Sequence, residues 1–324
     1  MKRRHLLAFL LAALPLHADP TPDRPSVIIA TGASGGEAYG SAFAQWAANW
    51  KDAGTTAGAQ IVTLPPGEPT AREQLRKALE TETKESASAL WLVLLGHGSF
   101  DGREGKFNLP GDDLAVSELA TWLQPFQRPV VIVCSFSASG AFLKPLSGAG
   151  RIVVTATRSG AENNYARLGG YLSETIASPS ADLDKDGQTS LLEAWLAAAQ
   201  RTAEFYKSEE RLATEHPLLD DNGDGLGTPA DWFQGVRAVK KSSDQRAADG
   251  LRAHQIHLVP SAAERSLPAT QRTERDGLER ELAHLREAKT TLAADEYYAK
   301  LEALLLRLAR LYAEKPPAVP APQP

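Results

Sequence analysis

Two apolar segments of the chain each lead into a side chain that could take part in covalent catalysis. Residues 91–95 are followed, after one glycine, by His97 and Gly98, and residues 130–133 are followed by Cys134. Short apolar runs bounded by Gly or Pro are typical of buried parallel strands. The carboxyl ends of neighbouring parallel strands meet at one edge of a sheet, with the strands just under ~5 Å apart. The sequence therefore predicts that His97 and Cys134 face each other as general acid–base and thiol nucleophile.

Both residues also have less specific explanations. A histidine between glycines is equally compatible with an ordinary turn, and a lone cysteine is often a small buried thiol. Cys134 is the only cysteine, so the chain cannot form an internal disulfide. The glycine after His97 allows its N–H to approach a substrate carbonyl, and together with the Cys134 N–H it could form an oxyanion hole. The catalytic interpretation depends on His97 and Cys134 being close together.

The two motifs together resemble the caspase-like superfamily of cysteine peptidases. Residues 135–140 and 152–165 are most similar to the bacterial legumain-type members of that superfamily. The resemblance implies peptide-bond hydrolysis through a thioester, with His97 as the acid–base, Cys134 as the nucleophile and Gly98 as an oxyanion donor. Cys134 is followed by Ser-Phe-Ser and is not set in Gln-Ala-Cys-Arg-Gly, so the aspartate specificity of caspases is not implied. The strand after the nucleophile often lines the specificity pocket in this superfamily, although a surface Arg or Glu can equally be a solvated charge. The candidate substrate-binding residues there are Thr157, Arg158, Ser159 and Glu162.

Residues 182–193 match the twelve-residue calcium loop at every key position. Such a loop places oxygen donors at positions 1, 3, 5 and 9, a glycine at position 6 and a glutamate at position 12. The expected ligands are Asp182, Asp184, Asp186, Gln188 through its carbonyl, Ser190 and Glu193. The alternative is an acidic turn that caps the following helix.

Residues 220–231 repeat the start of the calcium pattern, with a shorter aspartate at the twelfth position. The expected ligands are Asp220, Asn222, Asp224, Leu226 through its carbonyl, Thr228 and Asp231. We expect Ca²⁺ in both loops to act as a structural clip, because a chain without disulfides gains stability from an ion that binds only its folded state.

The elements that must position these residues alternate between strand and helix. Strands are expected at 26–30, 60–64, 90–95, 130–133 and 151–157. This alternation predicts an α/β fold with a doubly wound, mostly parallel sheet, here caspase- or legumain-like. The predicted organisation is a signal peptide at 1–18, a peptidase domain at 26–245 that contains both calcium loops, a helical hairpin at 265–314 and a Pro-rich tail at 315–324.

Composition restricts the partners and the location. The basic start and the apolar run up to residue 16 predict a secretory signal, and hence a periplasmic or secreted protein. The formal net charge of −5 argues against nucleic acid as a partner. No other segment is apolar enough to span a membrane. We expect a protein or peptide substrate and self-association through the charged, leucine-rich C-terminal helices.

The Gly-rich turn after the first predicted strand matches two further motifs. The turn at 31–36 resembles a dinucleotide-binding turn and also a serine nucleophile elbow. The second strand ends in Thr-Leu-Pro-Pro without an acid for a ribose, and an elbow would follow several strands, so a substrate-facing loop is favoured. The alternative to a peptidase is a catalytically inactive caspase-like binding or scaffold protein.

Overall fold

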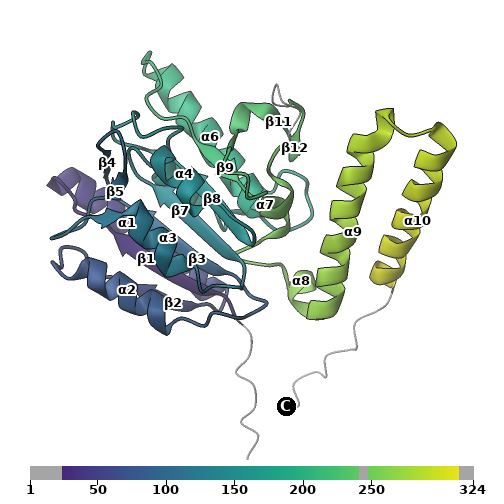
Figure 1. The fold of residues 1–324 in the computed structure, drawn as a ribbon, viewed down its shortest axis with the longest axis horizontal. Coiled ribbons are helices and arrows are strands. Elements are labelled where there is room, and N and C mark those ends of the chain that lie inside the picture. The colour runs from purple at the N-terminus through teal and green to yellow at the C-terminus, as the bar shows by residue number, and fades with distance from the viewer. Residues whose placement is uncertain (1–23, 241–246, 314–324) are drawn as a thin grey trace, which may run out of the picture.

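The computed structural model describes residues 24–240 and 247–313, and a seven-stranded sheet with the order β10-β9-β8-β7-β3-β1-β2 lies at its centre (Figure 1). Its five parallel strands are β1 (Ser26–Thr31), β2 (Gln60–Thr63), β3 (Leu90–Leu95), β7 (Val130–Ser135) and β8 (Arg151–Thr155). The strands β9 (Leu218–Asp220) and β10 (Thr228–Pro229) extend it in antiparallel fashion. The predicted α/β class with a mostly parallel sheet is therefore confirmed.

Helices cover both faces of the sheet. One face packs against α1 (Glu37–Thr56), α5 (Leu168–Thr175) and α6 (Leu191–Ser208). The other packs against α2 (Ala71–Thr81), α3 (Val116–Leu123) and α4 (Gly140–Leu146). Successive strand side chains point to opposite faces, so Val133 of β7 joins the first core and Ile132 and Cys134 join the second.

Several elements differ from the sequence-based expectation. The strand β7 begins at Val130 as expected but ends at Ser135, two residues beyond the predicted end at residue 133. A second, three-stranded antiparallel sheet consists of β4 (Gly98–Phe100), β5 (Gly105–Phe107) and β6 (Leu114–Ala115). The remaining short elements are η1 (Pro179–Ala181), η2 (Ala230–Trp232), β11 (Phe233–Gln234), β12 (Arg237–Ala238), α7 (Leu251–Gln255) and α8 (Ala262–Ser266).

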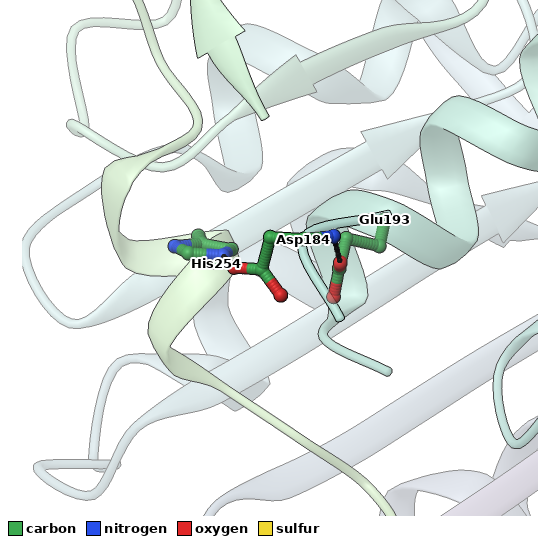
Figure 2. A group of neighbouring side chains, drawn as sticks. All are labelled: Asp184, Glu193 and His254. Carbon is green, nitrogen blue, oxygen red and sulfur yellow. Dashed lines mark hydrogen bonds and ion pairs between the residues drawn. The ribbon is translucent and has the colours of Figure 1, made fainter. Parts of the chain in front are cut away.

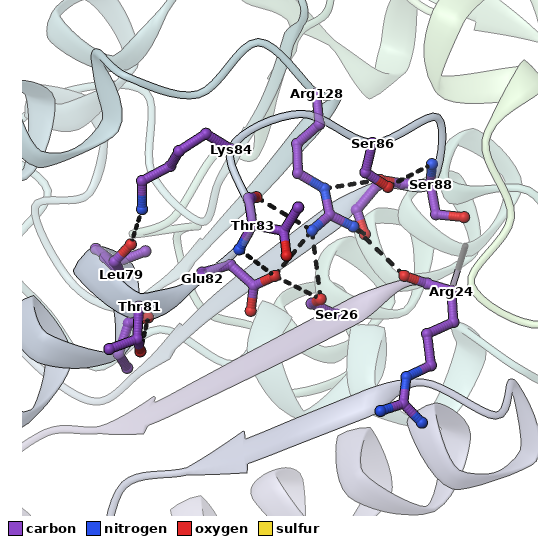
Figure 3. Close-up of polar contacts among 12 residues, drawn as sticks. Arg24, Ser26, Leu79, Thr81, Glu82, Thr83, Lys84, Ser86, Ser88 and Arg128 are labelled. Atoms are coloured by element: carbon purple, nitrogen blue, oxygen red, sulfur yellow. Dashed lines mark hydrogen bonds and ion pairs between the residues drawn. The ribbon is translucent and has the colours of Figure 1, made fainter. Parts of the chain in front are cut away.

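A buried ion pair fastens the amino-terminal ends of the central strands (Figure 3). Arg128 and Glu82 lie 2.9 Å apart, with side chains only 1% and 5% exposed. The guanidinium also donates to the carbonyl oxygens of Ser88 at 2.8 Å and Ala89 at 3.2 Å, and Glu82 accepts from the Ser26 hydroxyl at 2.9 Å. Arg128 therefore ties the start of β7 to the starts of β1 and β3, at the edge opposite the candidate site.

The C-terminal part is a helical hairpin of α9 (Ala269–Glu287) and α10 (Ala294–Ala313), joined through η3 (Ala288–Thr290). Figure 1 shows it beside the α/β body, with α10 on the far side of α9. Within the described ranges, no helix combines the length and the apolarity needed to cross a membrane. The predicted signal peptide at 1–18 and the tail at 315–324 lie outside the described residues.

Candidate functional site

The register of the two central strands decides which residue faces His97. Leu94 of β3 pairs with Cys134 of β7, and Leu95 pairs with Ser135. His97 lies three residues beyond Leu94, so the same step along β7 leads past Cys134 to Ser137. Cys134 therefore lies three residues short of the level that His97 occupies at this edge of the sheet.

The Cys134 thiol is sealed inside the protein. The residue is 0% exposed and belongs to the apolar cluster that contains Leu94 and Phe107. Burial raises the pKa of this thiol well above its usual range. A nucleophilic cysteine must reach substrate and ionise near neutral pH. The burial of this thiol opposes the predicted role of Cys134 as the nucleophile. The strand is longer than expected, and its alternation turns this side chain into the core.

Ser137 is the residue that contacts the histidine turn. Its Oγ accepts a hydrogen bond from the Gly98 N–H at 3.1 Å and donates one to the Gly98 carbonyl at 3.0 Å. Ser137 is only 3% exposed. The amide predicted to donate to a substrate oxyanion is thus already used within the protein. Gly98 also has a steric role, because a Cβ there would lie 2.5 Å from the Ser137 carbonyl oxygen.

His97 is held by aromatic rings and by one carbonyl. Its Nε2 lies 3.1 Å from the carbonyl oxygen of Ser34, in the loop after β1. The centroids of Tyr39 and Phe43 lie 5.0 and 5.2 Å from the imidazole centroid, and Tyr165 lies 6.2 Å away. The partner of Nε2 is therefore a backbone carbonyl, and the ring is enclosed on the α1 side of the site.

A largely apolar cavity of about 750 Å³ opens beside this histidine, at the carboxyl ends of β1 and β2. Ser34 and Phe43 line it and also contact His97. Small residues of α1, including Ala44 and Ala48, leave the space open, and Lys51 is the charged residue in its lining. The strands β2 and β3 lie on opposite sides of β1, so the order of the strands reverses at β1. Open α/β sheets bind ligands beyond the carboxyl ends of the strands at such a reversal.

The four predicted substrate-binding residues lie next to the Ser137 turn, but two of them are used internally. Thr157 is 0% exposed, and its Oγ1 accepts from the Gly140 N–H at 2.8 Å. Glu162 accepts from the backbone N–H groups of Arg158 and His216, and the Nδ1 of His216 lies 2.6 Å from its carboxylate. These internal contacts oppose the predicted substrate-binding role of Thr157 and Glu162, whereas the Arg158 side chain is 63% exposed and Ser159 is partly exposed.

The loop of residues 182–193, predicted to bind calcium, has three of its predicted oxygen donors close together. One carboxylate oxygen each of Asp182, Asp184 and Asp186 lies within 4.8 Å of the others. Glu193 joins the loop to α6, because its Oε1 accepts from Leu183 N–H at 2.8 Å and Asp184 N–H at 3.2 Å. Figure 2 shows Asp184 between Glu193 and His254, whose Nε2 lies 3.0 Å from an Asp184 carboxylate oxygen.

In the first loop the ninth residue, Ser190, donates its hydroxyl to Glu193 Oε2 at 2.8 Å. The Gln188 side-chain carbonyl accepts from the Ser261 N–H at 3.1 Å, well along the chain. Four of the predicted ligands, Asp182, Asp184, Asp186 and Glu193, thus lie around one turn, and α6 begins within the last positions of the loop.

The second calcium loop is closed by a residue that the sequence analysis missed. Asp231 lies 2.6 Å from Lys240 and its side chain is 70% exposed, which opposes the twelfth-ligand role predicted for it. Asp249, only 3% exposed, accepts instead from the N–H groups of Asp221 at 2.8 Å and Asn222 at 3.1 Å. These are the second and third loop positions, the same positions that Glu193 contacts in the first loop.

Asp249 and Glu193 also make the same contact with the ninth residue of their loops. Thr228 donates its hydroxyl to Asp249 Oδ2 at 2.7 Å, as Ser190 does to Glu193. The other predicted donors remain in the loop, where Asp220 accepts from Gly223 and Gly225 N–H, and Asp224 accepts from Leu226 N–H. Burial, and then the nearby Asp221 carboxylate, raises the pKa of Asp249 to about 7. No local spacing rule could have pointed to Asp249.

Comparisons with known proteins give structural similarity alone. No family model matches the chain, and no curated protein matches it. The Drosophila initiator caspase Dronc is 12% identical with a TM-score of 0.42, over 63% of this chain and 81% of that one. Caspase-1 from Spodoptera frugiperda is 11% identical with a TM-score of 0.40, over 67% and 94%. Protein GSU0716 from Geobacter sulfurreducens is 11% identical with a TM-score of 0.39, over 63% and 97%.

Proposed function

We propose that this chain is a non-catalytic binding or scaffold protein built on a peptidase-like α/β sheet. The observation that carries the proposal is the hydrogen bonding of Ser137. A serine becomes a nucleophile only when a base accepts its proton. The Ser137 hydroxyl donates to the Gly98 carbonyl, and the Nε2 of His97 faces the Ser34 carbonyl. The competing prediction, an exported cysteine endopeptidase, needs a Cys134 thiol that reaches substrate, and its burial opposes this.

The ligand of such a protein is best sought in the cavity beside His97. Its small and apolar lining suits an apolar side chain of a protein or peptide partner, and Lys51 suits a carboxylate near it. We place peptide binding there because the cavity is continuous with the residues that hold the histidine. Peptides that bind without being cut would fit a binding protein.

The experiment is a peptide library presented to the full chain, with cleavage and binding measured in parallel. We expect bound peptides and no cleavage above that of the Cys134→Ala and Ser137→Ala variants. Ala48→Trp, which fills the cavity, should lose the binding, whereas Ala203→Trp at an exposed position of α6, away from the cavity lining, should keep it. Cleavage that disappears in Cys134→Ala or Ser137→Ala, or binding unchanged by Ala48→Trp, would contradict the proposal.

We propose in addition that both loops bind Ca²⁺. The support is the convergence of Asp182, Asp184 and Asp186, and the matching contacts that Glu193 and Asp249 make with the two loops. Hard oxygen donors in this spacing suit Ca²⁺. Bound Ca²⁺ would fasten the start of α6 and the segment before α7 to the sheet.

We also propose export to the periplasm or outside the cell, on the composition of residues 1–18. Amino-terminal sequencing of the protein recovered from the producing cells tests this. A mature chain that starts near residue 19 in an extracytoplasmic fraction is the expected result, and an intact chain retained inside the cell would contradict it.

A further inference from the structure

The outer face of α10 is an apolar surface without a partner in the described part of the chain. Tyr298, Leu305 and Leu306 are 57%, 46% and 51% exposed. The opposite side of α10 packs on α9, where Tyr297 is buried. Figure 1 shows no other element beyond α10, so this face points away from the body. Contiguous exposed apolar side chains on one helix face are a mark of an interaction surface.

The surface is shaped as a groove between two rows of side chains. A groove of about 540 Å³ is lined by Tyr298, Leu301, Glu302, Leu305, Leu306 and Ala309. Residues 298, 302 and 306 form one row with a spacing of four, and residues 301, 305 and 309 form the next. A row with the same spacing on another helix fits into such a groove. The shape of the surface therefore suits a helix.

The charged residues beside the groove indicate which helix would bind in it. Glu302 lies four residues before Leu306, and Arg310 lies four residues after it, on the same row. Within the described ranges neither makes an ion pair within 4.0 Å, whereas Arg307 pairs with α9 through Glu281 at 3.5 Å. An antiparallel second copy of α10, with a twofold axis at Leu306, would set Glu302 of each copy opposite Arg310 of the other.

We propose that the chain self-associates through α10, with two copies packed antiparallel across Leu306. Each copy contributes the same surface, as a twofold interface requires, and the Glu302–Arg310 contact occurs twice. A parallel pairing would bring like charges together, which disfavours it. The apolar row supplies the buried area and the two charge pairs set direction and register. This association does not depend on the proposed absence of catalysis.

The test is sedimentation equilibrium of the full chain, with a charge swap. We expect a concentration-dependent dimer, and each of Glu302→Arg and Arg310→Glu should raise its dissociation constant by about tenfold through repulsion at both ends. The double variant Glu302→Arg/Arg310→Glu should restore wild-type association, which also shows that the single variants fold. Arg76→Glu on the distant helix α2 serves as the matched charge control and should change nothing.

Leu306→Asp should abolish the dimer, because it places a charge on the axis. Three results would overturn the proposal. The wild-type chain could remain monomeric at all concentrations, the single variants could associate like the wild type, or the double variant could remain as weak as either single one.

Discussion

The Ser137 hydroxyl binds both polar groups of one residue, accepting from the Gly98 N–H at 3.1 Å and donating to the Gly98 carbonyl at 3.0 Å. This pair of hydrogen bonds joins the turn after β7 to the turn after β3. It also uses the N–H group that a substrate oxyanion would need. The two turns that the sequence predicts to form a catalytic site are therefore hydrogen-bonded to each other.

The first prediction concerns the close approach at Gly98. A Cβ there would lie 2.5 Å from both the Ser137 carbonyl oxygen and the Phe136 ring, so Gly98→Ala should destabilise the fold by about 1–3 kcal/mol. The matched control is Gly277→Ala in α9, where a Cβ meets nothing within 4 Å. This control should stabilise the protein by about 0.5–1 kcal/mol, because alanine favours a helix. Urea unfolding measures both, and equal effects would contradict the Gly98 assignment.

The second prediction concerns the buried ion pair at the other edge of the sheet. Arg128→Met leaves the Glu82 carboxylate buried without its partner, and should lower the free energy of unfolding by roughly 3–5 kcal/mol. Arg76→Met breaks the exposed pair with Glu80 and should cost less than about 1 kcal/mol. Thermal and urea unfolding measure both variants. A similar loss in the free energy of unfolding for the two variants would contradict this prediction.

The third prediction separates the two candidates for the last ligand of the second loop. Calorimetric titration with Ca²⁺ alone should detect two sites, and Glu193→Gln should weaken the first. Asp249→Asn should weaken the second by roughly 10- to 100-fold, because it removes a charge that closes the loop. Asp231→Asn, at an exposed residue paired with Lys240, should leave both sites unchanged. If Asp231→Asn abolished the second site and Asp249→Asn preserved it, Asp231 and not Asp249 would be the last ligand of the second loop.

The fourth prediction follows from the direction of the Cys134 pKa. Because burial raises the folded pKa, the thiol contributes stability below its unfolded pKa of about 8.5, and this contribution falls as the pH rises above that value. In Cys134→Ala the loss of stability above that pH should be smaller than in the wild type. The same variant should lower the free energy of unfolding at pH 7 by about 1 kcal/mol, because it leaves a small cavity. Urea unfolding of both proteins from pH 7 to 10 provides the comparison. Parallel pH profiles would show that the thiol ionises freely in the folded state.

The parallel strands could be predicted because their signals are local, and the calcium-loop pattern is likewise a local signal, although Ca²⁺ binding itself stays a prediction. Apolar runs mark β3 and β7, and fixed spacing marks residues 182–193. The end of β7 could not be read in the same way, since Cys134 and Ser135 suit a buried strand as well as they suit the turn after it. That difference of two residues moves the thiol from the edge into the core.

Long-range contacts explain the other errors. Asp249 reaches the second loop from the segment before α7, and Tyr165 reaches His97 from beyond β8. Both depend on how distant segments fold together, for which no periodicity or motif gives a signal. Thr157 and Glu162 follow β8 and so lie near the site, but the Gly140 N–H that binds Thr157 and the His216 ring that contacts Glu162 could be identified only in the folded structure.

The most direct test of the account is the rate at which iodoacetamide labels Cys134, the only thiol of the chain. We predict slow labelling of the folded protein, unchanged by His97→Ala, and fast labelling once urea unfolds it. Rapid labelling of the folded protein that slows when His97 is replaced would contradict the account, because it would show an accessible thiol activated by the imidazole.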